Sequence, residues 1–228
     1  GEFRKWYGNH DCVVNWENDG YLLKNTKDDK GKVPAHAFNE KYIFKPNVNW
    51  SAVSSSFFSG RITPKGSLFD AGGSAAFPGD LESTYKLCAF LNSYVARDAL
   101  LAINPTLNFQ AWNIGNLPVN IELLPQSVVS STKILFNEAK RDWDLYEVSW
   151  DFNKHSLLGY KEFNLIKVSF EHKVNEDSKR IISVATEERL LNESLIQVFE
   201  LDEKTNLDTP IQQISLKVNP CYRYGKES

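Results

Sequence analysis

The basic and aromatic side chains at the start of this chain are of types that could act on a ligand. Arg4 and Lys5 stand directly before Trp6 and Tyr7 in the run "FRKWYGN". Such a mixture suits a surface that grips a phosphate backbone or stacks on a flat group, and it equally suits a strand with one solvated edge. Two interpretations stay open: Arg4 and Lys5 contact phosphates, or Trp6 and Tyr7 pack a joint between domains.

A second set of polar side chains gathers in a segment that we expect to be rich in strands. Its members are Lys45, Asn49, Ser54, Ser55, Arg61 and Lys65. Amide, hydroxyl and cationic groups hydrogen-bond phosphates and base edges, and Arg is the commonest reader of guanine. If these residues bind a nucleic acid, Lys45, Arg61 and Lys65 should share one concave face.

Catalytic chemistry finds no support in the residue pattern. His10, Asp11 and Cys12 follow one another in the chain, and adjacent residues of a strand point to opposite faces, so neighbours in this run cannot form a base–nucleophile pair. The sequence contains no GxSxG, HExxH or GxGxxG pattern, and its three cysteines match no zinc or disulfide spacing. We therefore expect no catalytic, cofactor-binding or metal-binding residue in this chain.

Composition and charge narrow the class of protein. The 228 residues are 42% hydrophobic and 13% aromatic, with a net charge of -3, which is typical of a folded protein. No run approaches the length of a membrane span, no secretory signal opens the chain, and the scattered cysteines fit a reducing cytoplasm. The chain lacks an initiating Met, so we expect it to be a piece of a longer protein.

The charge balance counts against a self-sufficient nucleic-acid-binding domain. The residues up to Ser127 are close to neutral and the remainder is mildly acidic, whereas such domains normally carry a strongly basic face. Nucleic-acid binding is then plausible only if a partner domain supplies most of the phosphate contacts.

The elements that must position these residues form an α+β arrangement. Short apolar runs between Gly, Pro, Asn and Asp predict strands at 13–16, 42–44, 48–53, 61–63 and 68–69. A 3.6-residue stripe predicts one long helix over 80–103, with Asp80 or Ser83 as its cap. Residues 112–119, "WNIGNLPV", are interpreted as a strand with an exit loop.

The second half is expected to be a smaller mixed α/β region. A helix over 125–144 should bury the face marked by Val128, Thr132, Leu135 and Ala139. Alternation predicts a strand over 164–174, and a helix capped by Thr186 should follow over 186–201. The predicted division is a β-rich domain over 1–125 and a spacer helix with the C-terminal region over 126–228.

Several long stretches, read in order, resemble one known family. They include "FRKWYGNHDCVVNWENDGYLLKN", "FKPNVNWSAVSS", "PKGSLFDAGGSAAF", "LNSYVARDALLAINPTLNFQAWNIGNLPV", "DWDLYEVSWDF", "NESLIQVFELDE" and "NPCYRYG". Together they resemble the part of BREX phage-defence adenine-specific DNA methyltransferases of the PglX type that follows the catalytic domain. Residues 50–119 are also similar, more loosely, to target-recognition domains of type I restriction specificity subunits.

The resemblance implies a division of labour. The longer protein would transfer a methyl group from S-adenosylmethionine to the exocyclic amine of adenine, and this chain would select the double-stranded DNA sequence. The family's NPPY motif and glycine-rich cofactor motif have no match here, since residues 104–107 read "NPTL". The implied partners are DNA, an upstream methyltransferase domain of the same chain, and other defence proteins; no membrane is involved.

Two other functions remain open at this stage. The aromatic residues Trp6, Tyr7, Trp16 and Trp50 could instead mark a carbohydrate- or peptide-binding β module, which would show coplanar exposed rings. The acidic part from Trp143 onward could dock onto a protein partner within a defence complex.

Overall fold

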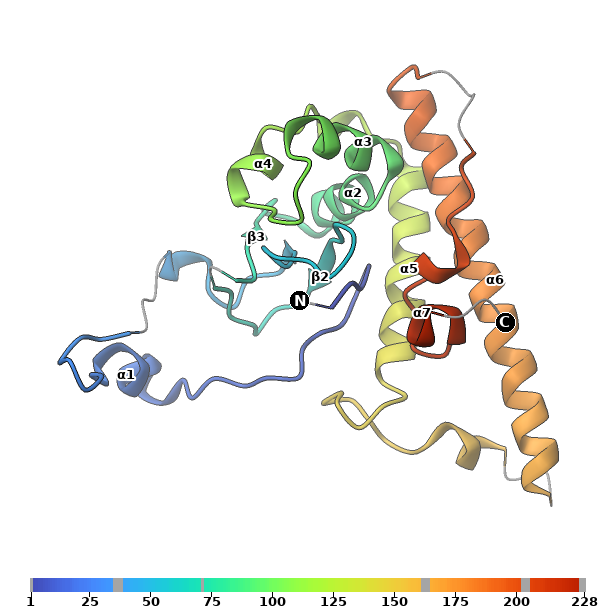
Figure 1. Ribbon diagram of the computed structural model, residues 1–228, viewed down its shortest axis with the longest axis horizontal. Helices are drawn as coiled ribbons and strands as arrows, with labels where there is room; N and C mark the ends of the chain where they lie inside the picture. Colours follow the sequence, from blue (N-terminus) through green and yellow to red (C-terminus); the bar gives the residue numbers. More distant parts are fainter. Residues whose placement is uncertain (1, 35–38, 71, 161–164, 202–205, 226–228) are drawn as a thin grey trace.

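The computed structural model describes residues 2–34, 39–70, 72–160, 165–201 and 206–225 (Figure 1). The elements run α1 (Glu17–Asn25), η1 (Glu40–Tyr42), β1 (Asn47–Asn49), β2 (Arg61–Thr63), β3 (Ala75–Ala76), α2 (Leu81–Leu91), α3 (Tyr94–Ile103), α4 (Ala111–Gly115), η2 (Ile121–Leu123), α5 (Gln126–Trp143), η3 (Ser156–Gly159), α6 (Ile166–Val198), η4 (Ile211–Gln213) and α7 (Pro220–Tyr224). Helices α2 to α4 cover a small sheet, and α5 and α6 lie side by side next to this layer (Figure 1).

The sheet is antiparallel and has the order β2-β1-β3. Val48 on the central strand is paired with Ile62 on one side and Ala76 on the other. Side chains of a strand alternate between faces, and Val48 and Ile62 are buried in the same core as α2. The opposite face therefore carries the polar residues of these strands, including Asn49 and Arg61.

The mixture of helices with a small sheet is confirmed, but the first part of the chain is less rich in strands than expected. The strand predicted at 13–16 is absent, because Val13 and Val14 lie exposed without a neighbouring strand. At 42–44 the chain instead ends a 3-10 turn and reaches Phe44, whose φ of 64° no strand residue adopts. Residues 68–69 also lie outside the three strands.

The long helix predicted over 80–103 is divided into α2 and α3. Asp80 does cap its start, since its Oδ1 accepts a hydrogen bond from the Ser83 N–H at 2.8 Å. Asn92 ends α2 by exchanging two hydrogen bonds with the Gly60 backbone, each 2.9 Å long. Ser93 then caps α3 by accepting from the Ala96 N–H. A contact with the sheet thus interrupts a locally favourable helix.

The segment interpreted as a strand at 112–119 was assigned wrongly. Residues Ala111–Gly115 form the short helix α4, and Asn113 closes its start by accepting a hydrogen bond from the Gln110 N–H at 2.8 Å. Side-chain amides compete with extended structure by capping backbone groups locally.

The second half is helical among the residues that the structure describes, where a mixed α/β region was expected. Helix α5 is confirmed, and Val128, Thr132, Leu135 and Ala139 are buried as predicted. The strand predicted at 164–174 falls mostly within α6, which is 33 residues long; residue 164 is outside the described residues. Thr186 lies in the middle of this helix and does not cap one; its hydroxyl bonds to the Ile182 carbonyl.

Helix α6 also explains why the alternation misled. Its exposed apolar residues Ile166, Phe170 and Val174 recur every four positions. Residues four apart share one face both in a strand and in a helix, so this spacing fits either element. Within the described part of the chain, no helix has the length and apolar character needed to cross a membrane.

Candidate nucleic-acid interface

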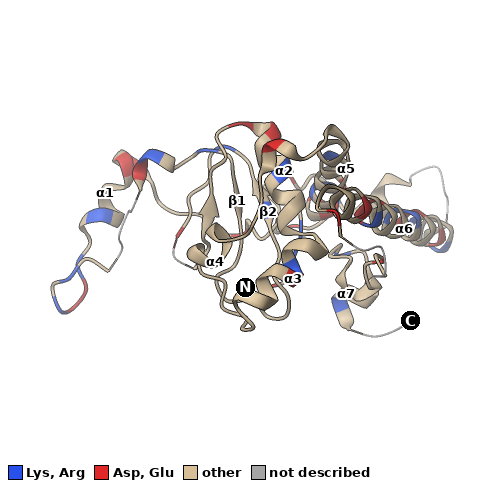
Figure 2. Ribbon diagram, turned by 90° about the horizontal axis from the view of Figure 1, so that it is seen from above, with Lys and Arg blue, Asp and Glu red and all other residues tan. Residues whose placement is uncertain are grey.

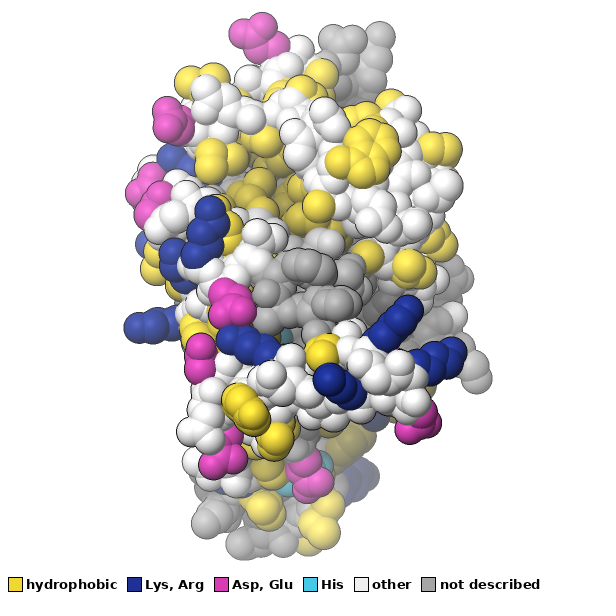
Figure 3. All heavy atoms as spheres, turned by 90° about the vertical axis from the view of Figure 1, so that its left-hand side faces the viewer, with side chains coloured by type: hydrophobic (Ala, Val, Ile, Leu, Met, Phe, Trp, Pro, Cys, Tyr) yellow, Lys and Arg dark blue, Asp and Glu magenta, His cyan; other side chains and the backbone are white. Residues whose placement is uncertain are grey.

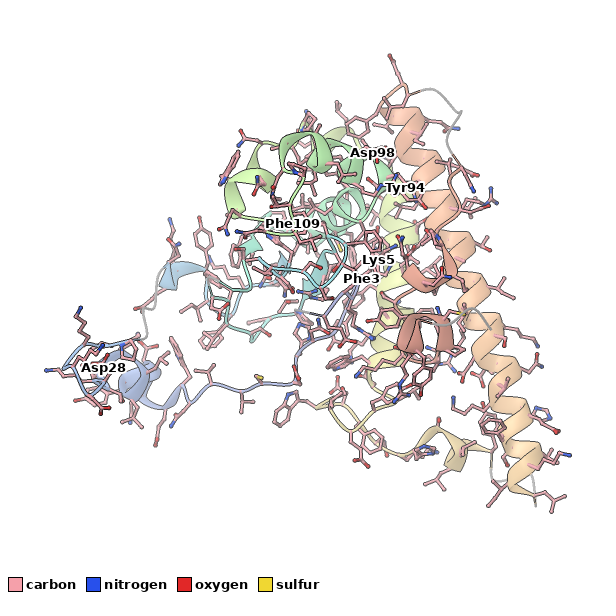
Figure 4. All side chains as sticks on the ribbon, viewed as in Figure 1. Phe3, Lys5, Asp28, Tyr94, Asp98 and Phe109 are labelled. Carbon is pink, nitrogen blue, oxygen red and sulfur yellow. The ribbon has the colours of Figure 1, made fainter. Side chains whose placement is uncertain are left out.

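The N-terminal run lies in the interior, between the sheet and the helix pair (Figure 4). Arg4 is only 1% exposed. Its Nη2 pairs with Asp142 Oδ2 of α5 at 2.9 Å, and its Nε donates to the Tyr7 carbonyl at 2.7 Å. The guanidinium carbon also lies 5.0 Å from the centre of the Trp143 ring. Arg4 therefore fastens the start of the chain to α5.

Lys5 and Trp6 make the matching connection to α6. Lys5 Nζ pairs with Glu188 Oε2 at 2.7 Å, and the Trp6 indole N–H donates to Glu188 Oε1 at 2.8 Å. The Trp6 backbone also bonds to Gly60 and Ile62, which adds the run to the β2 edge. We call Arg4, Lys5, Trp6, Asp142 and Glu188 the N-terminal joint.

Asp142 holds a third part of the chain in the N-terminal joint. Its carboxylate accepts the backbone N–H groups of Lys217 at 2.7 Å and Val218 at 3.0 Å. The C-terminal segment is thereby tied to the same point through Lys217, which lies 75 residues after Asp142 in the chain. A fully buried carboxylate that accepts hydrogen bonds from one guanidinium and two amides is a structural contact that requires precise geometry.

These positions argue against one interpretation of "FRKWYGN", phosphate contacts by Arg4 and Lys5; a joint with a neighbouring domain stays a prediction. Arg4 and Lys5 have no surface through which phosphates could reach them, while Trp6 and Tyr7 are buried in the core. The run is the joint between the sheet layer and the helix pair, and Arg4 and Lys5 are removed from the candidate DNA contacts.

Arg61 is also not on the concave surface where we expected it. It is 5% exposed and donates from Nε to Asn49 Oδ1 at 3.1 Å and from Nη2 to Ser51 Oγ at 3.2 Å. Among the described residues no carboxylate forms an ion pair with it. Burial accordingly lowers the pKa of Arg61 to about 10. Arg61 lies beneath the polar sheet face and orders Asn49 and Ser51.

The remaining candidates occupy the surface to different degrees. Lys45 and Lys65 are exposed and lie at the same end of the sheet, because Phe44 exchanges backbone hydrogen bonds with Gly66 and Ser67. Asn49 is half-buried and Ser55 is exposed, whereas Ser54 is buried with its hydroxyl bonded to the Phe57 carbonyl. The structure thus brings Lys45 and Lys65 together and separates them from the buried Arg61.

Lysines are prominent on the face of the molecule that includes this end of the sheet. Figure 3 shows Lys and Arg side chains across the middle of the face, with Asp and Glu side chains among them and hydrophobic side chains gathered above. Lys45 and Lys41 both lie over the Tyr42 ring, at 5.5 Å and 4.9 Å from its centre. In these contacts the ammonium group itself lies on the ring, and both lysines remain exposed to solvent.

An aromatic pocket beside Lys45 escaped the sequence reasoning. It measures about 270 Å³ and is lined by Asn39, Tyr42, Phe69, Ala75 and Phe77. The rings of Tyr42 and Phe77 are stacked with centroids 4.8 Å apart. Its lining residues come from separate stretches of the chain, so no local pattern indicated this pocket.

The contacts and the lowered pKa of His10 were also not foreseen from the sequence. Its Nε2 lies 3.2 Å from Thr63 Oγ1, and its ring meets that of Tyr7 edge-on. Burial, reinforced by the nearby Arg61 and Arg4 guanidinium groups, lowers the pKa of His10 to about 4. The imidazole is therefore neutral at physiological pH.

A larger hollow of about 650 Å³ lies between α5, α6 and the segment that connects them. Its charged side chains pair with one another: Lys140 with Asp144 and Asp151, Arg180 with Glu138, and Lys173 with Asp177. Figure 2 shows both signs of charge interspersed along α6. Charges that neutralise each other offer little attraction to DNA phosphates. Within the described ranges, no three His, Cys, Asp or Glu side chains are grouped to hold a metal ion.

Comparison with known proteins places this arrangement in context. The chain is 32% identical over 222 residues to the adenine-specific methyltransferase PglX of Lacticaseibacillus casei (strain Zhang), which covers 95% of the chain and 18% of the relative. It is 32% identical over 228 residues to the adenine-specific methyltransferase BrxX of Escherichia coli O9:H4 (strain HS), which covers 99% of the chain and 18% of the relative. No protein-family model matches.

The chain thus spans about one-fifth of the length of these relatives, and nearly all of it takes part in the match. Two long alignments at the same identity confirm the resemblance that the sequence motifs indicated. The chain corresponds to a segment of the PglX- and BrxX-type adenine-specific methyltransferases.

Proposed function

We propose that this chain is the DNA target-recognition part of an S-adenosylmethionine-dependent adenine-N6 DNA methyltransferase of a phage-defence system. The observation that carries the proposal is the match of almost the entire chain to one segment of two adenine-specific methyltransferases. The sequence contains no NPPY motif, and "NPTL" at 104–107 is no substitute because it lacks the second Pro and the aromatic residue, so this segment is better suited to choosing a site than to modifying it. The methyl donor would bind elsewhere in the longer protein.

The exposed lysines supply the proposed contacts with the DNA backbone. Lys45 and Lys65 project from the same end of the sheet, where two cations can meet neighbouring phosphates. Asn49 and Ser55 lie closer to the sheet and offer amide and hydroxyl groups of the kind that read base edges. Arg61 contributes indirectly by holding the Asn49 side chain.

The N-terminal joint gives this surface a fixed orientation. It clamps the sheet layer onto α5 through Arg4 and onto α6 through Lys5 and Trp6. The paired helices then serve as a rigid spacer. A recognition surface must keep its register relative to the enzyme that receives the flipped adenine, because the amine cannot be reached within the base stack.

An exchange of segments tests the proposal. Residues 10–124 of the full-length protein that carries this chain are replaced by those of a relative, and methylated adenines are mapped by long-read sequencing of host DNA. These boundaries leave Arg4, Lys5, Asp142 and Glu188 in place, so both ion pairs of the N-terminal joint are kept. A control protein exchanges only residues 144–160.

The proposal expects the methylated motif to follow the 10–124 segment and to stay unchanged in the control. Methylation at the original motif after the 10–124 exchange would contradict target recognition by this part. If methylation is lost altogether, thermal unfolding of the exchanged protein distinguishes a broken fold from a folded enzyme without a target. A folded protein that methylates no motif also counts against the proposal.

A further inference from the structure

A charge-free surface stands out next to the exposed Lys41, Lys45 and Lys65, which we call the lysine band. Residues 46–60 and 99–121 contain no Asp, Glu, Lys or Arg, and both segments come together beside the sheet. Five large apolar side chains project from them. Leu101, 58% exposed, lies on α3, and the other four are Val53 and Trp112, each 61% exposed, Leu107, 48%, and Phe57, 47%. We call these four residues the apolar face. Figure 3 shows hydrophobic side chains gathered over this upper part of the molecule.

The backbone under the apolar face is held in one conformation. The Ser54 N–H donates to the Leu107 carbonyl at 3.1 Å, and the Phe109 N–H donates to the Ala52 carbonyl at 2.6 Å. The buried Trp50 adds an indole hydrogen bond to the Phe109 carbonyl at 2.9 Å. The two loops therefore form one preformed surface, which reduces the entropy lost when a partner binds.

The composition of the apolar face favours a protein partner over DNA. Interfaces between proteins are depleted of charge at their centre and enriched in aromatic side chains, and exposed apolar clusters mark such sites. Interfaces with DNA are strongly positive. Lys45 and Lys65 supply positive charge outside the apolar face. The lysines are therefore suited to DNA and the apolar face to a protein.

Phe3, at the start of the chain, lies next to the apolar face, and this position indicates which polypeptide binds to that face. The Phe3 N–H donates to Ser55 Oγ at 3.3 Å, and the Phe3 ring packs edge-on against Phe57 at 5.8 Å. A polypeptide that precedes Phe3 would therefore enter beside Phe57, at the edge of the apolar face. In the two relatives most of the length lies outside the matched segment.

We propose that the apolar face is the docking site for the polypeptide that precedes Phe3 in the full-length protein. The proposal rests on the proposed function in that it takes this chain as one part of a longer methyltransferase. The docked surface is expected to be apolar and poor in charge. Docking there fixes the recognition part against the preceding part while the lysine band stays open to DNA.

Photo-cross-linking within the full-length protein tests the docking site. A benzophenone amino acid, p-benzoylphenylalanine, replaces Trp112, and after irradiation the cross-linked peptides are identified by mass spectrometry. A matched control carries it at Ile182 of α6, which is 66% exposed. Isotope-mixed samples separate links within one polypeptide from links between two copies.

The proposal expects position 112 to cross-link to peptides that precede Phe3 in the same polypeptide, and position 182 to give none of these links. In a Leu107→Glu background the yield should fall about tenfold or more, because an unpaired carboxylate resists burial. Links only to DNA, links only between two copies, or no links from position 112 would each overturn the proposal. A motif that fails to follow residues 10–124 while these links persist would reject target recognition and leave the docking site standing.

Discussion

Replacing Asp142 with Ala should destabilise the protein far more than the loss of an ordinary ion pair. Asp142 is fully buried and accepts hydrogen bonds from Arg4, Lys217 and Val218. The substitution leaves a buried guanidinium without its counter-charge, which costs about 3–5 kcal/mol. It also leaves two backbone N–H groups unsatisfied, which adds to the loss when water cannot reach them.

The expected result is a fall in the free energy of unfolding of at least about 4 kcal/mol, since the separate costs are not fully additive. For a chain of this size each kcal/mol lowers Tm by roughly 2–4 °C, so Tm should fall by roughly 10 °C. Urea unfolding followed by circular dichroism gives the free energy, and a thermal scan gives Tm.

The exposed ion pair between Arg189 and Glu193 on α6 provides the control. Glu193→Gln should change stability by less than about 1 kcal/mol, because solvent screens surface pairs. If Asp142→Ala resembles this control, Arg4 is not held as the structure shows, and the assignment of "FRKWYGN" to the interior is wrong.

Three further outcomes follow from the same structure. Lys45→Ala combined with Lys65→Ala should reduce the slope of log affinity against log salt for DNA binding by about 2, near one unit per lost phosphate contact. The control Lys167→Ala, at an exposed position of α6, should leave the slope unchanged. An unaltered slope in the double variant would remove both lysines from the interface. Arg61→Ala should lower the free energy of unfolding, measured in urea, by about 1–3 kcal/mol through the lost hydrogen bonds to Asn49 and Ser51. Methylation at sites with one mismatch should also rise relative to the cognate site. Unchanged discrimination between these sites would show that Arg61 does not order Asn49 for recognition. His10 has a pKa of about 4 in the folded chain against 6.5 for the free side chain, so it binds a proton more readily when the chain is unfolded. Its contribution to the free energy of unfolding is therefore complete above pH 6.5 and is lost as the pH falls toward 4, by at most about 3 kcal/mol. His10→Phe should flatten that part of the profile of stability against pH, and an equally steep profile would assign the loss to other groups.

The sequence by itself determined the features that depend on neighbouring residues. The cap at Asp80 and the buried face of α5 were predicted correctly, because a cap spans three residues and a helical stripe repeats within two turns. The motifs in order also indicated the family resemblance, which the comparisons confirmed. The target-recognition function and the contacts of Lys45 and Lys65 stay predictions.

Only the tertiary structure decided which cations face the solvent. Arg4 and Lys5 are paired with carboxylates 138 and 183 residues away along the chain, a separation at which no local pattern indicates a partner. The break between α2 and α3 has the same cause, since Asn92 bonds to Gly60, the residue directly before β2 and 32 residues earlier in the chain. Propensity describes what a segment prefers alone, whereas burial depends on the distant groups that the fold brings against it.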